Sequence, residues 1–252
     1  MGTAVKRVGF YLLLLAIWEG LFRLHFWPEF LFPSPRGVFE AILEGFRDRT
    51  YLLGIAISLR RIAIGYGFSI VAGILLGFLL ARSRLLDETL GSLILGLQTL
   101  PSICWLPLAL LWFGLNERAI LFVVIMGSLL SITIATDAGV KHVPPLLIRA
   151  AKTMGAKGVK LYIAVIPPAA LPSIIGGMKQ GWSFAWRSLM AGELLFVSLG
   201  LGHLLSMGRE LNDMSQVMAV MLVIIVIGLL VDRLIFARLE RSVRERWGLQ
   251  EA

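Results

Sequence analysis

The sequence predicts an all-α, polytopic membrane protein with six transmembrane helices in a single domain, residues 1–252. Hydrophobic residues make up 58% of the chain and charged residues 16%, and the mean hydropathy is +0.83. So much apolar surface does not fit inside one water-soluble globule. A helix crosses a hydrocarbon core about 30 Å thick with about 20 apolar residues. Six runs have this character, at roughly 8–26, 62–81, 91–113, 118–137, 174–196 and 216–236.

The 24 Lys and Arg residues sort by membrane side. With a cytoplasmic N-terminus, 14 of the 24 fall in cytoplasmic segments, seven fall outside, and Arg23, Lys179 and Arg187 lie within spans or at their ends. The excess of positive charge on one side predicts that both termini are cytoplasmic. The net charge of +8 forms no basic face with interleaved aromatics, so we expect membrane lipid and no nucleic acid as a partner.

Between the first two runs, the stretch "LFPSPRGVFEAILEGFRD" predicts a short helix. Ser34 is suited to the N-cap position and Pro35 to the first helical position. Apolar residues from Val38 to Phe46 recur at helical spacing, with charged residues on the opposite side. We therefore expect an amphipathic helix in the outer interface. A packing brace is favoured over a role in substrate handling.

The second run carries a stripe of small residues. Gly65, Ser69, Gly73, Gly77 and Ala81 follow one another every fourth position. Such a stripe lies on one side of a helix and lets another helix approach closely. The neighbour could belong to the same chain or to a second copy.

The third run contains Pro101 and Pro107, and each proline removes a backbone hydrogen bond and tends to kink a helix. A bent helix suits either the lining of a translocation path or packing alone. The single cysteine, Cys104, lies in this apolar run, and we expect a buried structural thiol. The three histidines are scattered without metal-ligand spacing, so no metal site is expected.

A polar stretch, "RAAKTMGAKGVKLYIAVIPPAALP", separates the fourth and fifth runs at residues 149–172. Pro144 and Pro145 end the preceding helix, a short helix closed by glycine follows, and the prolines at 167, 168 and 172 delay the next run. The short helix should lie parallel to the membrane. Its lysines keep it out of the lipid. It could enter a groove on a soluble partner or be a solvated basic loop.

Charges inside spans are costly and are candidates for function. Lys179 can extend its ammonium group toward the cytoplasm, whereas Arg187 lies about 20 Å along the fifth helix, near the midplane. Glu193 points elsewhere around the helix, so it is no local partner of Arg187. The Arg187 guanidinium therefore needs either a structural carboxylate, for which Glu19 is one candidate, or an anionic substrate.

The polar stretch at residues 149–172 resembles a signature of the membrane subunits of ATP-binding-cassette importers. Their signature is Glu-Ala-Ala, then Gly after three residues, then a hydrophobic-x-Leu-Pro cluster. Ala150, Ala151 and Gly155 match the first part and Val165 and Pro168 the second, while Arg149 replaces the Glu and Pro167 the Leu. The stretches "LFPSPRGVF", "SLRRIAIGY", "TLPSICWLPLALLWFG" and "GWSFAWRSLMAGELL" are similar to the branch that imports nitrate, sulfonates, taurine and bicarbonate.

The resemblance implies a type I importer permease of the bacterial inner membrane, paired with a second copy of itself. It implies two cytoplasmic ATP-binding subunits and a periplasmic or lipid-anchored substrate-binding protein. Residues 141–172 become the coupling segment, which contacts the ATPase through Arg149, Ala150, Ala151, Gly155 and Ala156. The chain lacks a phosphate-binding G-x-x-x-x-G-K-[ST] loop, so ATP and Mg belong to the partner ATPase. Candidate residues of the translocation path are Pro101, Trp186, Arg187 and Glu193.

Three functional classes compete. For the importer permease, the expected substrate is a small anion. Related permeases import thiamine precursors, riboflavin or aromatic acids, so these compounds are alternative substrates. A secondary carrier should carry inverted repeats with broken helices at matching places, which the sequence does not display. An intramembrane enzyme needs a nucleophile and base or a metal set, and no such grouping appears. We therefore expect a permease without catalytic residues or a cofactor of its own.

Overall fold

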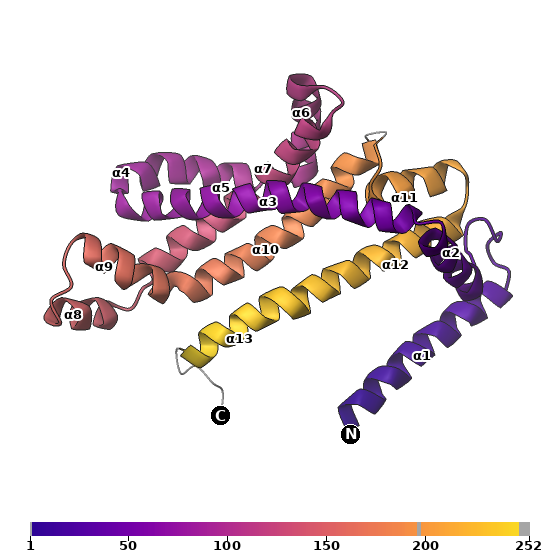
Figure 1. Cartoon of the computed structure of the whole chain (residues 1–252), viewed down its shortest axis with the longest axis horizontal. Coiled ribbons are helices and arrows are strands. Elements are labelled where there is room, and N and C mark those ends of the chain that lie inside the picture. Colours follow the sequence, from indigo (N-terminus) through magenta and orange to yellow (C-terminus); the bar gives the residue numbers. More distant parts are fainter. Residues whose placement is uncertain (1, 196–197, 247–252) are drawn as a thin grey trace. The chain divides into compact units, whose positions relative to one another are not determined.

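The computed structural model describes residues 2–195 and 198–246, and every regular element in these ranges is helical. The chain divides into two compact units, one of residues 1–58 and 193–227 and one of residues 59–192 and 228–252. The helices, labelled in Figure 1, are α1 (Gly2–Arg23), α2 (Pro35–Arg47), α3 (Thr50–Arg82), α4 (Arg84–Leu86), the π-helix η1 (Asp87–Gly91), α5 (Ser92–Gln98), the 3-10 helix η2 (Ser102–Trp105), α6 (Leu106–Phe113), α7 (Glu117–Lys141), α8 (Pro145–Thr153), α9 (Val159–Ala164), α10 (Ile166–Leu195), α11 (Leu201–Glu210), α12 (Met214–Val231), the π-helix η3 (Asp232–Phe236) and α13 (Ala237–Arg246).

In the first unit, the predicted helix cap is confirmed. The Ser34 hydroxyl accepts a hydrogen bond from the Gly37 amide at 3.0 Å, and Pro35 opens α2. This cap satisfies one of the amide groups that the first helical turn leaves without a partner. Trp18 on α1 donates its indole N–H to the Pro33 carbonyl at 3.0 Å, which fixes the chain that leads into α2.

The expected spans correspond to helices of unequal character. Within the described ranges, α3, α7 and the continuous stretch Met214–Val243 are long and apolar enough to cross a membrane, and a fourth crossing exists if a bent pair counts as one. The first predicted run lies in α1. The fifth lies in α10, except for residue 196, which is outside the described ranges. The number of six spans stays a prediction.

The small-residue stripe of α3 packs against α7 of the same chain, inside the second unit. A Cβ atom at Gly65, Gly73 or Gly77 would lie 3.0 Å or less from an α7 side chain. The two backbones can therefore approach only because these positions have no side chain. The α7 side chains that occupy the space are those of Val124, Ile132 and Thr136.

The third predicted run is broken rather than kinked. The helical stretches on either side of the break are Arg84–Gln98 and Ser102–Phe113, and the angle between them is 104°. Pro101 lies in the break, and Pro107 lies in the first turn of α6, where a proline costs no hydrogen bond. The expectation of a buried Cys104 is wrong, because the break places its thiol on the exposed surface of the chain.

The sequence predicts that the prolines at 167, 168 and 172 delay the next helix. The structure instead places all three prolines within that helix. Helix α10 begins at Ile166, so Pro167 and Pro168 occupy its first turn, and Pro172 lies inside the helix. The first four amide groups of a helix have no intrahelical acceptor, so prolines are tolerated there.

Candidate functional site

The coupling segment folds into two short helices, α8 and α9, which lie together at the end of α10 (Figure 1). Helix α7 ends at Lys141, and α8 begins four residues later, with Pro145 in its first turn. Three buried side chains, Ala151, Ala156 and Leu161, hold the two helices together. The expected short helix closed by a glycine is confirmed.

The turn after α8 explains the spacing of its small residues. Gly155 has φ +86°, a conformation that favours glycine because other residues lose free energy there. Its amide donates to the Lys152 carbonyl at 3.0 Å, and the Ala156 amide donates to the Ala151 carbonyl at 2.9 Å. These two bonds form a Schellman motif, in which the residue pair that flanks the turn also makes an apolar contact. Ala151 and Ala156 are that pair.

The outer surface of α8 is apolar and positively charged. Leu146 is 75% exposed and Met154 81% exposed, and the Arg149 and Lys152 side chains lie exposed between them. Residues 138–192 contain no Asp or Glu. An exposed apolar patch whose charged residues all have the same sign is typical of a surface that binds another protein.

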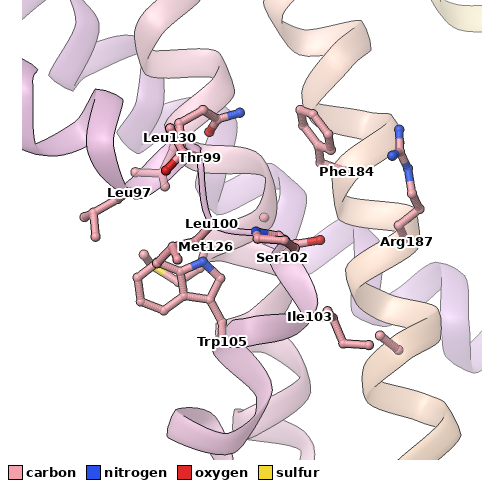
Figure 2. A pocket seen from close by; sticks show the side chains of 14 residues that line it. Leu97, Thr99, Leu100, Ser102, Ile103, Trp105, Met126, Leu130, Phe184 and Arg187 are labelled. Atoms are coloured by element: carbon pink, nitrogen blue, oxygen red, sulfur yellow. The ribbon is translucent and has the colours of Figure 1, made fainter.

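A second feature is a cavity of about 410 Å³ at the break between α5 and η2. Pro101 and Arg187, two of the four predicted path residues, both line it. Figure 2 shows Phe184 and Arg187 one turn apart on α10, with Ser102 and Ile103 on the facing element. The other lining residues are Leu97, Gln98, Thr99, Leu100, Trp105, Met126, Gly127, Leu130 and Ala191.

The Arg187 guanidinium keeps donors available for a ligand. Its Nε donates to the Ser183 carbonyl at 3.2 Å, and its central carbon lies 5.0 Å from the centre of the Phe184 ring. Among the described residues no carboxylate lies within 4.0 Å of it, and Glu19 is paired with Arg23 at 2.7 Å instead. A guanidinium has five N–H donors, so an anion in the cavity could accept several of them.

Glu193 does not line this cavity. Its carboxylate is fully buried in the first unit, where the Ser58 hydroxyl lies 2.7 and 2.9 Å from its two oxygens. The Gly202 amide, in the first turn of α11, donates to Glu193 Oε2 at 3.0 Å. Ser58 Oγ also accepts from the Leu201 amide at 2.9 Å. Glu193 thus fastens the start of α11 to α3 and α10.

Trp186 also lies outside the cavity lining. Its ring stacks on Trp182 with 5.8 Å between centroids. Trp182 in turn packs edge-on against Tyr66, whose hydroxyl donates to the Met178 carbonyl at 2.6 Å. The aromatic groups therefore join α3 to α10 near the cavity without reaching into it.

The polar lining residues Gln98, Thr99 and Ser102 were not among the sequence candidates. Each lies within three residues of Pro101 in a run that is otherwise apolar. The signal available in the sequence was that a proline inside a membrane run opens the helix and frees nearby polar groups to face a cavity.

Residues 69–245 match the family described as binding-protein-dependent transport system inner membrane component. The chain is 30% identical to the taurine transport system permease protein TauC of Escherichia coli, over 89% of this chain and 84% of that protein. It is 30% identical to the nitrate import permease protein NrtB of a Synechocystis species, over 81% of this chain and 77% of that protein. Inward-facing structures of the methionine ABC transporter MetNI include a chain that superposes with a TM-score of 0.67, at 18% identity, over 77% of this chain and 96% of that one. This likeness confirms the expected type I importer permease fold.

Proposed function

The chain belongs to the family of inner membrane components of binding-protein-dependent transport systems, and on that premise we propose that it is the membrane subunit of an ATP-driven importer of a small anion. The observation that carries this proposal is the exposed surface of α8 and of the turn that follows it, residues 145–156, which we call the α8 knob. The buried pair Ala151 and Ala156 and the turn at Gly155 present Leu146 and Met154 on its outer surface. Such a knob fits a groove on a soluble ATPase subunit.

The proposed complex contains two copies of this chain, two cytoplasmic ATP-binding subunits and an external substrate-binding protein. ATP and Mg bind in the ATP-binding subunits, and this chain contributes no catalytic residue. Closure of the two ATPases around ATP displaces the α8 knobs and shifts the helices between inward and outward openings. Such a cycle requires two states of the bundle that the ligands at each end favour unequally.

In the proposed orientation both termini and the coupling segment face the cytoplasm. The distribution of Lys and Arg between loops supports it, as does the exposed cationic surface of α8.

The substrate is proposed to be a small anion of the nitrate, sulfonate, taurine or bicarbonate type. The cavity supports this choice, since Arg187 lines it together with Gln98, Thr99 and Ser102. A guanidinium recognises a planar or tetrahedral oxyanion through paired N–H donors, most strongly where water is scarce. Import of a thiamine precursor, riboflavin or an aromatic acid is the second candidate, because apolar side chains cover much of the same cavity.

Gly155→Trp tests the docking role of α8. No atom lies within 4 Å of a Cβ at this position, so the added side chain meets no neighbour, and the strain of a positive φ falls on the exposed turn after α8. We expect membrane insertion at the normal level and about a tenfold or larger loss of the ATPase that copurifies with the chain, since a disrupted groove contact of 1.4 kcal/mol already changes binding tenfold.

Gly114→Trp is the matched control. Gly114 also has a positive φ, +70°, and open space around its Cβ position, but it lies outside the coupling segment. It should retain the ATPase. Normal copurification and transport in Gly155→Trp would remove the docking role from α8.

A further inference from the structure

Two lysines, one at the start of the coupling segment and one seven residues beyond its end, each lie between two carboxylates. Lys141 Nζ lies 2.6 Å from Asp87 and 2.7 Å from Asp137. Lys179 Nζ lies 3.0 Å from Asp232 and 3.5 Å from Glu240. We refer to these two groups as the Lys141 clip and the Lys179 clip; both lie wholly within the second unit.

The positions of the clips bracket the coupling segment. Lys141 is the last residue of α7, directly before the turn into α8, and Lys179 lies on α10, the helix that leaves the segment. Since residues 138–192 hold no Asp or Glu, neither lysine finds a carboxylate within the segment or between the segment and Glu193. The non-local partners come from η1, η3 and α13, which are remote in sequence.

Each clip attaches to a π-helix. Asp87 is the first residue of η1, and Asp232 is the first residue of η3. A π-helix interrupts the regular α-helical hydrogen bonds, and such interruptions are frequent at functional sites. A displacement that reaches η1 or η3 through its aspartate therefore acts where the regular α-helical hydrogen bonding is interrupted.

The clips also lead toward the cavity. Helix η1 continues directly into α5, whose final residues Leu97 and Gln98 line the cavity. Lys179 lies on the same helix as Arg187, eight residues before it, or about 12 Å along the axis at 1.5 Å per residue. The Lys141 clip thus joins the start of the coupling segment to the stretch that leads into the wall with Pro101, and the Lys179 clip ties the helix that carries Arg187 to η3 and α13.

We propose that Lys141 and Lys179 are positioning residues that transmit displacement of the coupling segment to the cavity walls. The inference rests on the proposed function, since it assumes that an ATPase moves α8. The two lysine side chains are partly exposed, at 37% for Lys141 and 39% for Lys179, and ion pairs at such sites contribute little to the stability of a fold. Their effect is therefore on position rather than on folding.

In each clip, the positive ammonium group lies between two negative carboxylates and attracts both of them. Without the Lys141 ammonium, Asp87 and Asp137 would face each other as like charges, and their repulsion would separate η1 from the end of α7. An arginine preserves the positive charge, whereas a methionine of similar length removes it. The pair of substitutions therefore separates charge from bulk.

The first measurement uses spin-label distances in the purified chain in lipid nanodiscs, on a Cys104→Ser background and diluted with unlabelled chain. One label replaces Thr153 on α8, and the second replaces either Leu95 on α5 or Leu239 on α13, all of which are exposed. We expect Lys141→Met to broaden the 153–95 distance distribution and Lys179→Met to broaden the 153–239 distribution. Lys141→Arg and Lys179→Arg should restore the narrow distributions.

Arg84→Met is the matched control, because it removes an ion pair to Glu88 that is exposed and local to one stretch of helix. It should leave both distributions narrow. Unchanged distributions in both Lys→Met variants would overturn the clips, and this outcome does not depend on any ATPase being present.

The second measurement is transport per ATP hydrolysed, in proteoliposomes that contain the complex with its copurifying ATPase. Both Lys→Met variants should hydrolyse ATP at about the wild-type rate while transport per ATP falls about fivefold or more, the lower end of typical coupling between sites. Arginine variants should recover coupling. A normal ratio in the Lys→Met variants contradicts the inference, whereas absence of a copurifying ATPase from the wild-type chain contradicts the proposed function and leaves the distance measurement to judge the clips.

Discussion

Arg187 is the residue on which the proposed contact with substrate depends most directly. It lines the cavity beside Phe184, and its only hydrogen bond among the described residues is to the Ser183 carbonyl. A structural carboxylate is one partner that the sequence allows for Arg187. Within the described ranges, no carboxylate forms an ion pair with Arg187. The position of the guanidinium therefore supports a contact with the proposed anionic substrate more than a role in holding helices together.

Arg187→Met should lower uptake of the transported anion about tenfold or more while the yield and melting temperature of the complex stay near wild type. The reason is that a charge-assisted hydrogen bond is worth about 1.5–3 kcal/mol, and the fold loses no ion pair. Arg187→Lys should recover only part of the uptake, because a single ammonium group lacks the paired donors of arginine. Uptake assays and thermal melts of both variants measure the two effects separately.

Arg118→Met provides the control, since Arg118 is an exposed cation at the start of α7 and does not line the cavity. A stable Arg187→Met complex that imports the anion at the normal rate would eliminate the contact with substrate. Poor yield of Arg187→Met together with normal transport per folded complex would instead assign the residue to structure.

At the scale of elements, the small-residue stripe of α3 is the feature that the sequence defines most clearly, and the structure shows that it packs on α7. A Cβ atom at Gly77 would lie 2.5 Å from the Thr136 Cβ atom and 2.7 Å from the Thr133 carbonyl oxygen. The carbonyl belongs to the backbone, so it cannot give way as a flexible side chain does. The two helices would have to separate to admit any larger residue.

Gly77→Leu should therefore destabilise the chain by about 1–3 kcal/mol or more, the usual cost of overpacking. Gly67→Leu is matched in residue, helix and added volume, but nothing lies within 4 Å of its Cβ position. It should change stability little. Unfolding of the detergent-solubilised chain by SDS, followed by circular dichroism, compares the two variants; equal stability would contradict the packing of α3 on α7.

Local features were predictable from the sequence, and contacts between distant residues were not. The Ser34 cap and the glycine turn after α8 depend on a few neighbouring residues, and both form as expected. The helix bends by 104° at the break around Pro101, more than the expected kink, and a proline in the sequence indicates a bend without specifying its angle.

The candidate site was predicted only in part for the same reason. Arg187 and Pro101 share one cavity, but Glu193 turns to Ser58, which is 135 residues away in the chain. The pairing of Lys141 with Asp87 joins residues 54 positions apart. Periodicity identifies the helices that carry such residues, but it does not specify which helices become neighbours.

At the scale of the whole molecule, the family identifies an inner membrane component of a binding-protein-dependent transport system, and the proposed function places its energy source in another protein. The α8 knob, the two clips and the cavity form a connected series of elements within the second unit. A secondary carrier needs no surface for an ATPase, and its substrate path would respond to an ion gradient. The two mechanisms therefore differ in what must be supplied from outside the chain.

Uptake into proteoliposomes tests the central claim most directly. The vesicles contain the chain with its copurifying ATPase and are supplied with the external binding protein and with radiolabelled taurine or nitrate as probes. We predict uptake of at least one probe that requires ATP on the side of the coupling segment and persists when proton and sodium gradients are abolished. Uptake by the chain alone, driven by an ion gradient without ATP, would contradict the account.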